Sequence, residues 1–182
     1  MKYTILIVPG LGDSGAEHWQ SYWLNQIENS EKLIQNEWNK PQLQHWLIAL
    51  ESKIAAIDGN IIIVAHSLGT ILVNHWTAKN YNKKVIGAML VAPADVDSEA
   101  HTPEETWNFA PIPVAILPYA SVVVTTDNDP YIAVEKAMDL AQKWGSDFVN
   151  VGTKGHLNTA SKLKNWAEGQ DILQTLINKI SQ

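Results

Sequence analysis

The chain has 182 residues, of which 46% are hydrophobic and 18% are charged, so it can bury a sizeable hydrophobic core. This composition excludes a disordered, collagen-like or coiled-coil protein, and we expect residues 1–182 to form a single domain. Thirteen Lys and Arg against 19 Asp and Glu give a net charge of −6, which argues against a nucleic-acid surface or a basic membrane patch. The absence of Cys excludes disulfides, thiolate metal ligands and a cysteine nucleophile.

The first apolar run is short, because Pro9 and Gly10 interrupt it after residues 5–8. It is too short for a signal peptide, and no other run approaches the length of a membrane span. We therefore expect a soluble, cytoplasmic protein that acts on a small molecule and binds neither nucleic acid nor membrane. The sequence makes no prediction about protein partners.

Short runs of β-forming residues alternate with longer helical patterns along the chain. In chain order, the first half is predicted to contain a strand at residues 3–8, a helix with Trp19, Trp23, Leu24 and Ile27 on one face, a weaker strand at residues 32–38, a helix from Pro41 to Ile57, a buried strand at residues 61–65 and a helix at residues 68–79. The second half is predicted to contain a strand at residues 84–91, an irregular Pro-rich region at residues 92–118, a strand at residues 120–125, a helix at residues 134–144, a strand at residues 147–151 and a helix at residues 171–180. This alternation predicts an open, doubly wound α/β fold, with a parallel sheet and helices on both of its faces.

The segment A-H-S-L-G at residues 65–69 lies where a predicted apolar strand ends and a helix begins. In that context Ser67 would sit on a tight turn at the carboxyl edge of the sheet, and the small residues Ala65 and Gly69 would allow the backbone to turn. The N–H groups that open the next helix would face a developing negative charge. We therefore interpret Ser67 as a nucleophile.

Two candidate acids, Asp127 and Asp129, follow the predicted strand at residues 120–125 in the segment T-T-D-N-D-P. A carboxylate at this edge could orient a histidine, although Asn, Asp and Pro are also common in solvated turns. Asp129 is favoured over Asp127, because the residues after it resemble the entry to the next helix.

His156 lies in the loop after the last predicted strand, where Gly152 and Gly155 make the chain pliable. A lone His is usually structural or solvent-exposed. Here, however, the chain order Ser67, Asp129, His156 is the order in which an α/β hydrolase places its triad. We therefore interpret His156 as the general base that acts on Ser67.

The loop after the first strand allows two interpretations. Gly10, Gly12 and Gly15 match the G-x-G-x-x-G fingerprint of dinucleotide-binding folds, and Glu37 lies 22 residues after Gly15, near the position where that fingerprint expects an acid. Pro9 before the first glycine, and the acidic residues in and after the loop, count against a bound pyrophosphate.

The other interpretation of this loop is an oxyanion site. A backbone N–H of Leu11 or Gly12, together with that of Leu68, would bind the oxygen anion that forms when Ser67 attacks a carbonyl. This interpretation also accounts for Asp129 and His156, whereas a dinucleotide-binding oxidoreductase explains neither.

Three further residues are predicted to line the substrate pocket. They are His66 inside the turn, His18 beside the glycine loop and Trp107 in the irregular region. No histidines show the H-x-x-x-H or H-E-x-x-H spacing, so we expect no metal site, and we expect no cofactor.

The chain resembles the small serine hydrolases of the retinoblastoma-binding-protein-nine and YdeN type. The resemblance rests on V-P-G-L-G-D-S-G-A-E-H-W-Q near the start, then A-H-S-L-G, T-D-N-D-P and V-G-T-K-G-H-L-N, in that order along nearly the whole chain. It departs from the larger hydrolases at Pro9-Gly10, where they have His-Gly, and at Ala65. The resemblance implies a minimal α/β-hydrolase fold of about six strands in the order 2-1-3-4-5-6, without a separate cap domain, and a triad of Ser67, His156 and Asp129.

The predicted activity is that of a carboxylesterase-like serine hydrolase, which cleaves small esters, thioesters or amides through an acyl-enzyme on Ser67. Two alternatives come from other classes of protein. One is a binding or scaffold protein that keeps the hydrolase fold without turnover, and the other is the dinucleotide-binding oxidoreductase. The sequence and the resemblance leave the substrate unidentified.

Overall fold

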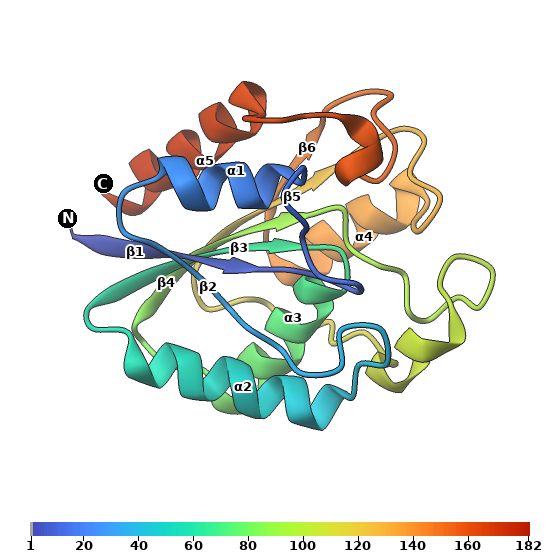
Figure 1. The fold of residues 1–182 in the computed structure, drawn as a ribbon, viewed down its shortest axis with the longest axis horizontal. Coiled ribbons are helices and arrows are strands. Elements are labelled where there is room, and N and C mark those ends of the chain that lie inside the picture. The colour runs from blue at the N-terminus through green and yellow to red at the C-terminus, as the bar shows by residue number, and fades with distance from the viewer. Residues whose placement is uncertain (1) are drawn as a thin grey trace.

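The computed structural model describes residues 2–182, in which six parallel strands form one sheet (Figure 1). In chain order the strands are β1 (Tyr3–Val8), β2 (Ser30–Lys32), β3 (Asn60–His66), β4 (Val85–Val91), β5 (Ala120–Thr125) and β6 (Asp147–Asn150). Their order across the sheet is β2-β1-β3-β4-β5-β6, which confirms the predicted α/β-hydrolase topology. Because all six strands run in one direction, the loops that follow them meet at a single edge of the sheet.

The central strands are buried on both faces, and their side chains alternate between two hydrophobic cores. In β3, Ile61 and Ile63 face one core while Ile62 and Val64 face the other, and all four are fully buried. Burial of each such side chain contributes about 2 kcal/mol, so the sheet is a firm support for its loops.

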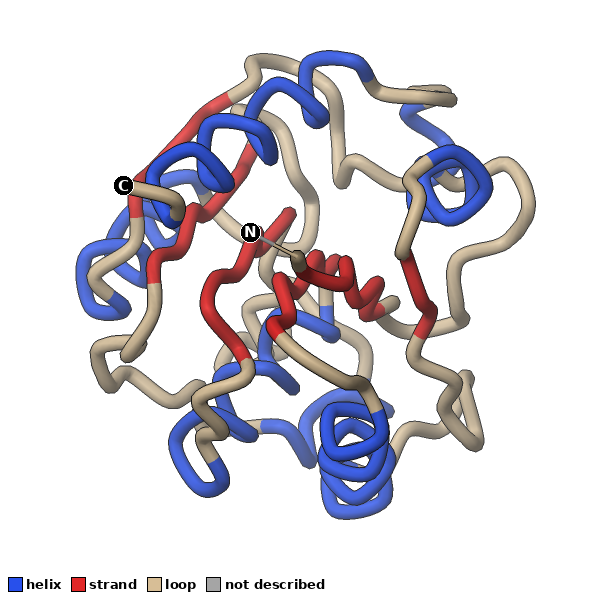
Figure 2. The backbone as a smooth tube through the Cα atoms, turned by 90° about the vertical axis from the view of Figure 1, so that its left-hand side faces the viewer, coloured by secondary structure: helices blue, strands red, loops and turns tan. Residues whose placement is uncertain are grey.

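Five α-helices cover the two faces of the sheet (Figure 2). One face carries α1 (Trp19–Gln26) and α5 (Ala167–Ile180), and the other carries α2 (Leu43–Ala56), α3 (Leu68–Asn80) and α4 (Val134–Trp144). The predicted helices on both faces are therefore confirmed. Within residues 2–182, no helix combines the length and the apolar character that a membrane span requires.

The second strand is where the sequence prediction is wrong. The pattern predicts a strand at residues 32–38, but β2 ends at Lys32, where it pairs with Ile7 of β1. Pro9 has no backbone N–H and the chain turns away there, so later residues of this segment have no neighbouring strand to pair with. The segment instead bends so that Trp38 packs edge-on against Trp46 of α2.

Two further elements differ from the prediction. The last helix begins at Ala167 and not at residue 171. The sequence pattern misses the first turn because Gly169 is a weak helix former. The ring of Trp166 fills the space that a side chain at position 169 would need. The irregular region at residues 92–118 contains a 3-10 helix, η1 (Glu104–Phe109), which the sequence pattern does not predict.

Candidate active site

Ser67 stands on a sharp turn between β3 and α3, at the edge of the sheet where the strands end. Its backbone angles, φ 54° and ψ −125°, are strained for a residue with a Cβ. The surrounding backbone holds this conformation, because the Ser67 N–H donates to the Val91 carbonyl of β4 at 2.9 Å. The N–H of Thr70 donates to the Ser67 carbonyl, also at 2.9 Å. The strained turn is thus held by a hydrogen bond to the neighbouring strand of the sheet.

Two glycines allow the loop after β1 to pack directly against this turn. A Cβ on Gly10 would lie 2.8 Å from the Cβ of Ser67 and 3.0 Å from the Leu68 nitrogen. A Cβ on Gly69 would lie 2.6 Å from the carbonyl oxygens of Val8 and Pro9. Any side chain at either position would therefore push the loop and the turn apart.

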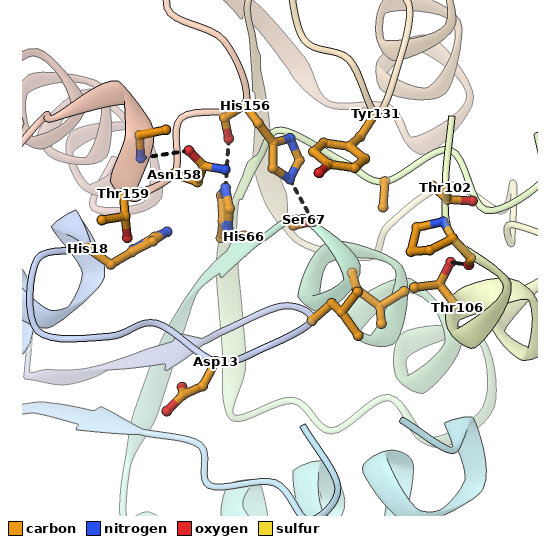
Figure 3. Close-up of a pocket in the computed structure, with 15 residues that line it drawn as sticks. Asp13, His18, His66, Ser67, Thr102, Thr106, Tyr131, His156, Asn158 and Thr159 are labelled. Atoms are coloured by element: carbon orange, nitrogen blue, oxygen red, sulfur yellow. Dashed lines mark hydrogen bonds between the residues drawn. The ribbon is translucent and has the colours of Figure 1, made fainter. Parts of the chain in front are cut away.

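The side chains of Ser67, His156 and Asp129 form one hydrogen-bonded chain (Figure 3). His156 Nε2 lies 2.8 Å from Ser67 Oγ, and Nδ1 lies 2.9 Å from each carboxylate oxygen of Asp129. Since a carboxylate accepts, Nδ1 carries the ring proton and Nε2 accepts the serine hydroxyl. The Asp129 side chain is fully buried, and Tyr131 N–H donates to its Oδ1 at 2.9 Å. This geometry can take a proton from Ser67 and compensate the charge that forms on the ring.

The alternative acid, Asp127, lies outside this chain. It is exposed, and its Oδ1 accepts a hydrogen bond from the Asn150 side chain at 2.6 Å. The structure therefore brings Asp129, and not Asp127, to His156.

The loop that carries His156 is fixed by ring N–H donors from two other elements. His66 Nε2 lies 2.9 Å from the His156 carbonyl, and Trp19 Nε1 donates to the next carbonyl, that of Leu157, at 2.8 Å. Leu157 has φ 50°, a conformation that needs such support. On the other side, the Thr126 hydroxyl donates to the Gly155 carbonyl at 2.6 Å. The His156 loop is therefore tied to α1, to β3 and to the residue that follows β5.

A cavity of about 270 Å³ opens at Ser67 and His156. Of the predicted pocket residues, His18 and His66 line it, as do Leu11 and Leu68. Trp107 does not, because its half-buried indole turns back into its own loop, where Nε1 donates to the Thr102 carbonyl at 3.0 Å. Thr102 and Thr106 of that loop line the cavity instead.

Sequence reasoning did not assign a role to several residues that line the cavity. The centroid of the Tyr131 ring lies 4.4 Å from that of the His156 ring, and Asn158 lines the same cavity. Both follow a predicted triad residue by two positions in the chain, which is the one local signal that could have indicated them.

The predicted anion-binding N–H groups separate into two kinds. Gly12 N–H donates to the Trp38 carbonyl at 3.0 Å and is therefore occupied. Within residues 2–182, the N–H groups of Leu11 and Leu68 have no hydrogen-bond acceptor. Leu68 is the first residue of α3, where the helix dipole adds a partial positive charge. Leu11 and Leu68 are thus the pair left for an anion, and Gly12 is not.

Two neutral imidazoles lie near His156. Burial, and to a lesser degree His156 and Lys32, lower the pKa of His18 to about 4. Burial also lowers the pKa of His66 well below its ordinary value, with His156 and His18 acting in the same direction. The centroid of the His66 ring lies 4.8 Å from that of His18 and 4.9 Å from that of His156. Because a charge on either ring would be poorly solvated, both are uncharged at neutral pH.

The glycine loop does not have the geometry of a dinucleotide site. In that fingerprint the helix opens at the glycines, whereas here α1 begins only at Trp19, capped by His18. Glu37 is exposed and follows β2 by several residues, so it does not end a strand. Gly10 packs on Ser67, which explains why it is a glycine. Within residues 2–182, no three His, Asp or Glu side chains are grouped so as to hold a metal ion.

The sheet order and the strained serine turn define an α/β hydrolase. Comparison with known proteins then supplies the family, because the model of the family described as serine hydrolase matches residues 5–175. The chain belongs to this serine hydrolase family. A comparison with curated proteins found no match.

Solved structures support the same assignment. A YdeN-like hydrolase from Pectobacterium atrosepticum is 28% identical, with a TM-score of 0.87 over 98% of this chain and 92% of that one. The ydeN gene product from B. subtilis is 18% identical, with a TM-score of 0.76 over 98% of this chain and 100% of that one. Est1E from Butyrivibrio proteoclasticus, solved with ferulic acid bound, is 13% identical, with a TM-score of 0.76 over 100% of this chain and 90% of that one. The last two show a shared fold.

The low pKa of His18 predicts how stability depends on pH. Between pH 6.5 and about 4 the unfolded chain binds a proton that the folded chain excludes, so the free energy of unfolding decreases as the pH falls through this window. From pH 7 to pH 5 we expect a loss of about 2 kcal/mol from His18, to which His66 adds.

Urea unfolding at pH 7 and pH 5 measures this loss. The control is His18→Asn, which keeps a side-chain cap for α1 but cannot titrate. The variant should lose less stability than the wild type over the same pH range, and an equal loss would contradict the prediction.

Proposed function

We propose that the chain hydrolyses small carboxylic esters through an acyl-enzyme on Ser67. The observation that carries this proposal is the unbroken chain of short hydrogen bonds from Ser67 through His156 to the buried Asp129. Membership of the serine hydrolase family supports it. Thioesters and amides are the related substrates that the same chemistry would cleave. That residues 1–182 act as one domain without a cap stays a prediction.

The proposed reaction has two halves. In the first, His156 Nε2 takes the proton of Ser67 as Oγ attacks the ester carbonyl, and Asp129 stabilises the charged ring. The N–H groups of Leu68 and Leu11 hold the tetrahedral oxyanion, and His156 then protonates the departing alcohol. In the second, His156 activates a water molecule that attacks the acyl-enzyme, which releases the acid and restores Ser67.

The volume of the cavity supports short acyl groups. About 270 Å³ lies just below the usual range for small-molecule sites, which begins at about 300 Å³. A second depression, of about 540 Å³, begins at the same Tyr131, His156 and Asn158 side chains and extends past Lys154. It provides room for a leaving group outside the acyl pocket.

Labelling by a fluorophosphonate probe, with p-nitrophenyl acetate turnover in parallel, tests the nucleophile. Wild type should label, and Ser67→Ala should lose the label together with turnover, by about 10⁵-fold or more, because only binding and the oxyanion N–H groups remain. A folded wild type that neither labels nor turns over would replace this proposal with that of a binding protein. Turnover that survives in Ser67→Ala would exclude Ser67.

The two aspartates provide a matched pair for the acid. Asp129→Asn should lower kcat about 10⁴-fold, because an amide stabilises the wrong tautomer of His156. Asp127→Asn carries the same chemical change on an exposed side chain and should stay within a few-fold of wild type. Steady-state kinetics of both variants measures the difference, and a larger loss in Asp127→Asn would reverse the assignment.

Acyl-chain length tests the size of the pocket. We expect kcat/KM for p-nitrophenyl acetate or butyrate to exceed that for the dodecanoate at least ten-fold, because a cavity of about 270 Å³ offers little room for an extended chain of twelve carbons beside the reacting ester group. Measurements below the critical micelle concentration of the long ester keep the comparison fair. Faster cleavage of the dodecanoate would contradict this prediction.

A further inference from the structure

The cavity at Ser67 has two chemically different ends (Figure 3). On one side lie Tyr131, Thr102 and Thr106. The hydroxyl groups of the two threonines already donate to backbone carbonyls of their own loop, so they offer no free donor to a ligand. On the other side lie His18, Asn158 and Thr159.

His18 places a hydrogen-bond donor at this second end. Its Nδ1 accepts from the Gln20 N–H at 3.2 Å, as the cap of α1, so the proton of the neutral ring is on Nε2. The residue is only 3% exposed, and within residues 2–182 Nε2 has no hydrogen-bond partner. Nε2 is not among the fully buried atoms that lack a partner, so this donor is accessible from the cavity, where a ligand can pair with it.

Asn158 adds a second donor beside it. Its Oδ1 accepts from the Ala160 N–H at 3.0 Å, which leaves the Nδ2 group, unpaired within residues 2–182, for a ligand. The charges nearby cancel, because Asp13, which also lines the cavity, pairs with Lys32 at 2.7 Å. An anionic ligand group would therefore meet a carboxylate without gaining a free cation, and an uncharged acceptor fits better.

We propose that the end of the cavity formed by His18 and Asn158 is a subsite for an uncharged oxygen acceptor on the substrate, namely an ether, carbonyl or hydroxyl oxygen near the scissile bond. This inference rests on the proposed ester hydrolysis at Ser67. It assigns His18 as the residue that determines specificity, since a site built to pair a polar atom discriminates against an analogue that lacks it.

Isosteric esters test the subsite on both sides of the scissile bond. On the acyl side, p-nitrophenyl methoxyacetate is compared with the butyrate, and on the alcohol side, 2-methoxyethyl butyrate is compared with butyl butyrate. In each pair one CH₂ replaces one oxygen. The readout is the ratio of kcat/KM for the oxygen-bearing ester to that for the alkyl ester, divided by the same ratio for alkaline hydrolysis.

Two substitutions separate the cavity donor from the helix cap. His18→Asn keeps a good cap for α1 but withdraws the donor at the Nε2 position, whereas His18→Gln places an amide N–H near that position and caps less well. We expect the normalised ratio of at least one ester pair to fall about five-fold in His18→Asn and to be retained in His18→Gln. Tm should change in the opposite order, with His18→Gln the less stable variant.

The outcomes distinguish this inference from the function it rests on. If wild type labels at Ser67 and cleaves the esters, but His18→Asn changes neither ratio, the subsite is wrong and the hydrolase proposal stands. A fall of equal size in His18→Gln would also overturn it, because the effect would then follow the loss of the ring and not of the donor. If folded wild type neither labels nor cleaves, both proposals fall.

Discussion

The close packing of the β1 end against the serine turn is the constraint on which the site depends. With no room for a side chain at Gly10 or Gly69, the two segments lie in backbone contact, and this contact brings Leu11 and Leu68 to one cavity. The same contact supports the strained backbone of Ser67 from the side opposite its hydrogen bond to Val91. A glycine two residues after a serine is thus a packing requirement as much as a turn signal.

The fold could be predicted from the sequence largely because the central strands are buried on both faces. Such strands appear as unbroken apolar runs, as at residues 61–65, and their helices show clear stripes. The edge of the sheet was harder to predict. Residues 32–38 show only a weak strand pattern, and whether they pair depends on how far β1 extends, which Pro9 limits. Pairing is a property of two segments, so one segment's pattern could not decide it.

The candidate site divides in a similar way. Ser67, Asp129 and His156 could be brought to one region because each lies in a segment that follows a strand of a parallel sheet, and these segments meet at one edge of the sheet. Trp107 and Gly12 were misjudged because their outcome depends on local hydrogen bonds, to Thr102 and Trp38 respectively, that no residue pattern encodes. Tyr131 was missed for a related reason, since its contact with His156 follows from the turn that Asp129 makes with the Tyr131 N–H.

The early end of β2 also affects how readily the edge of the sheet can pair with a strand of another molecule. Both outer strands are short, three residues in β2 and four in β6, against six or seven in the strands between them. Charged side chains mark both borders, with Lys32 at the end of β2 and Asp147, paired to Lys179 at 2.7 Å, at the start of β6. Short, charged borders expose few unpaired backbone groups to a passing strand. The fold therefore resists edge-to-edge association, and with it the growth of the sheet into an aggregate.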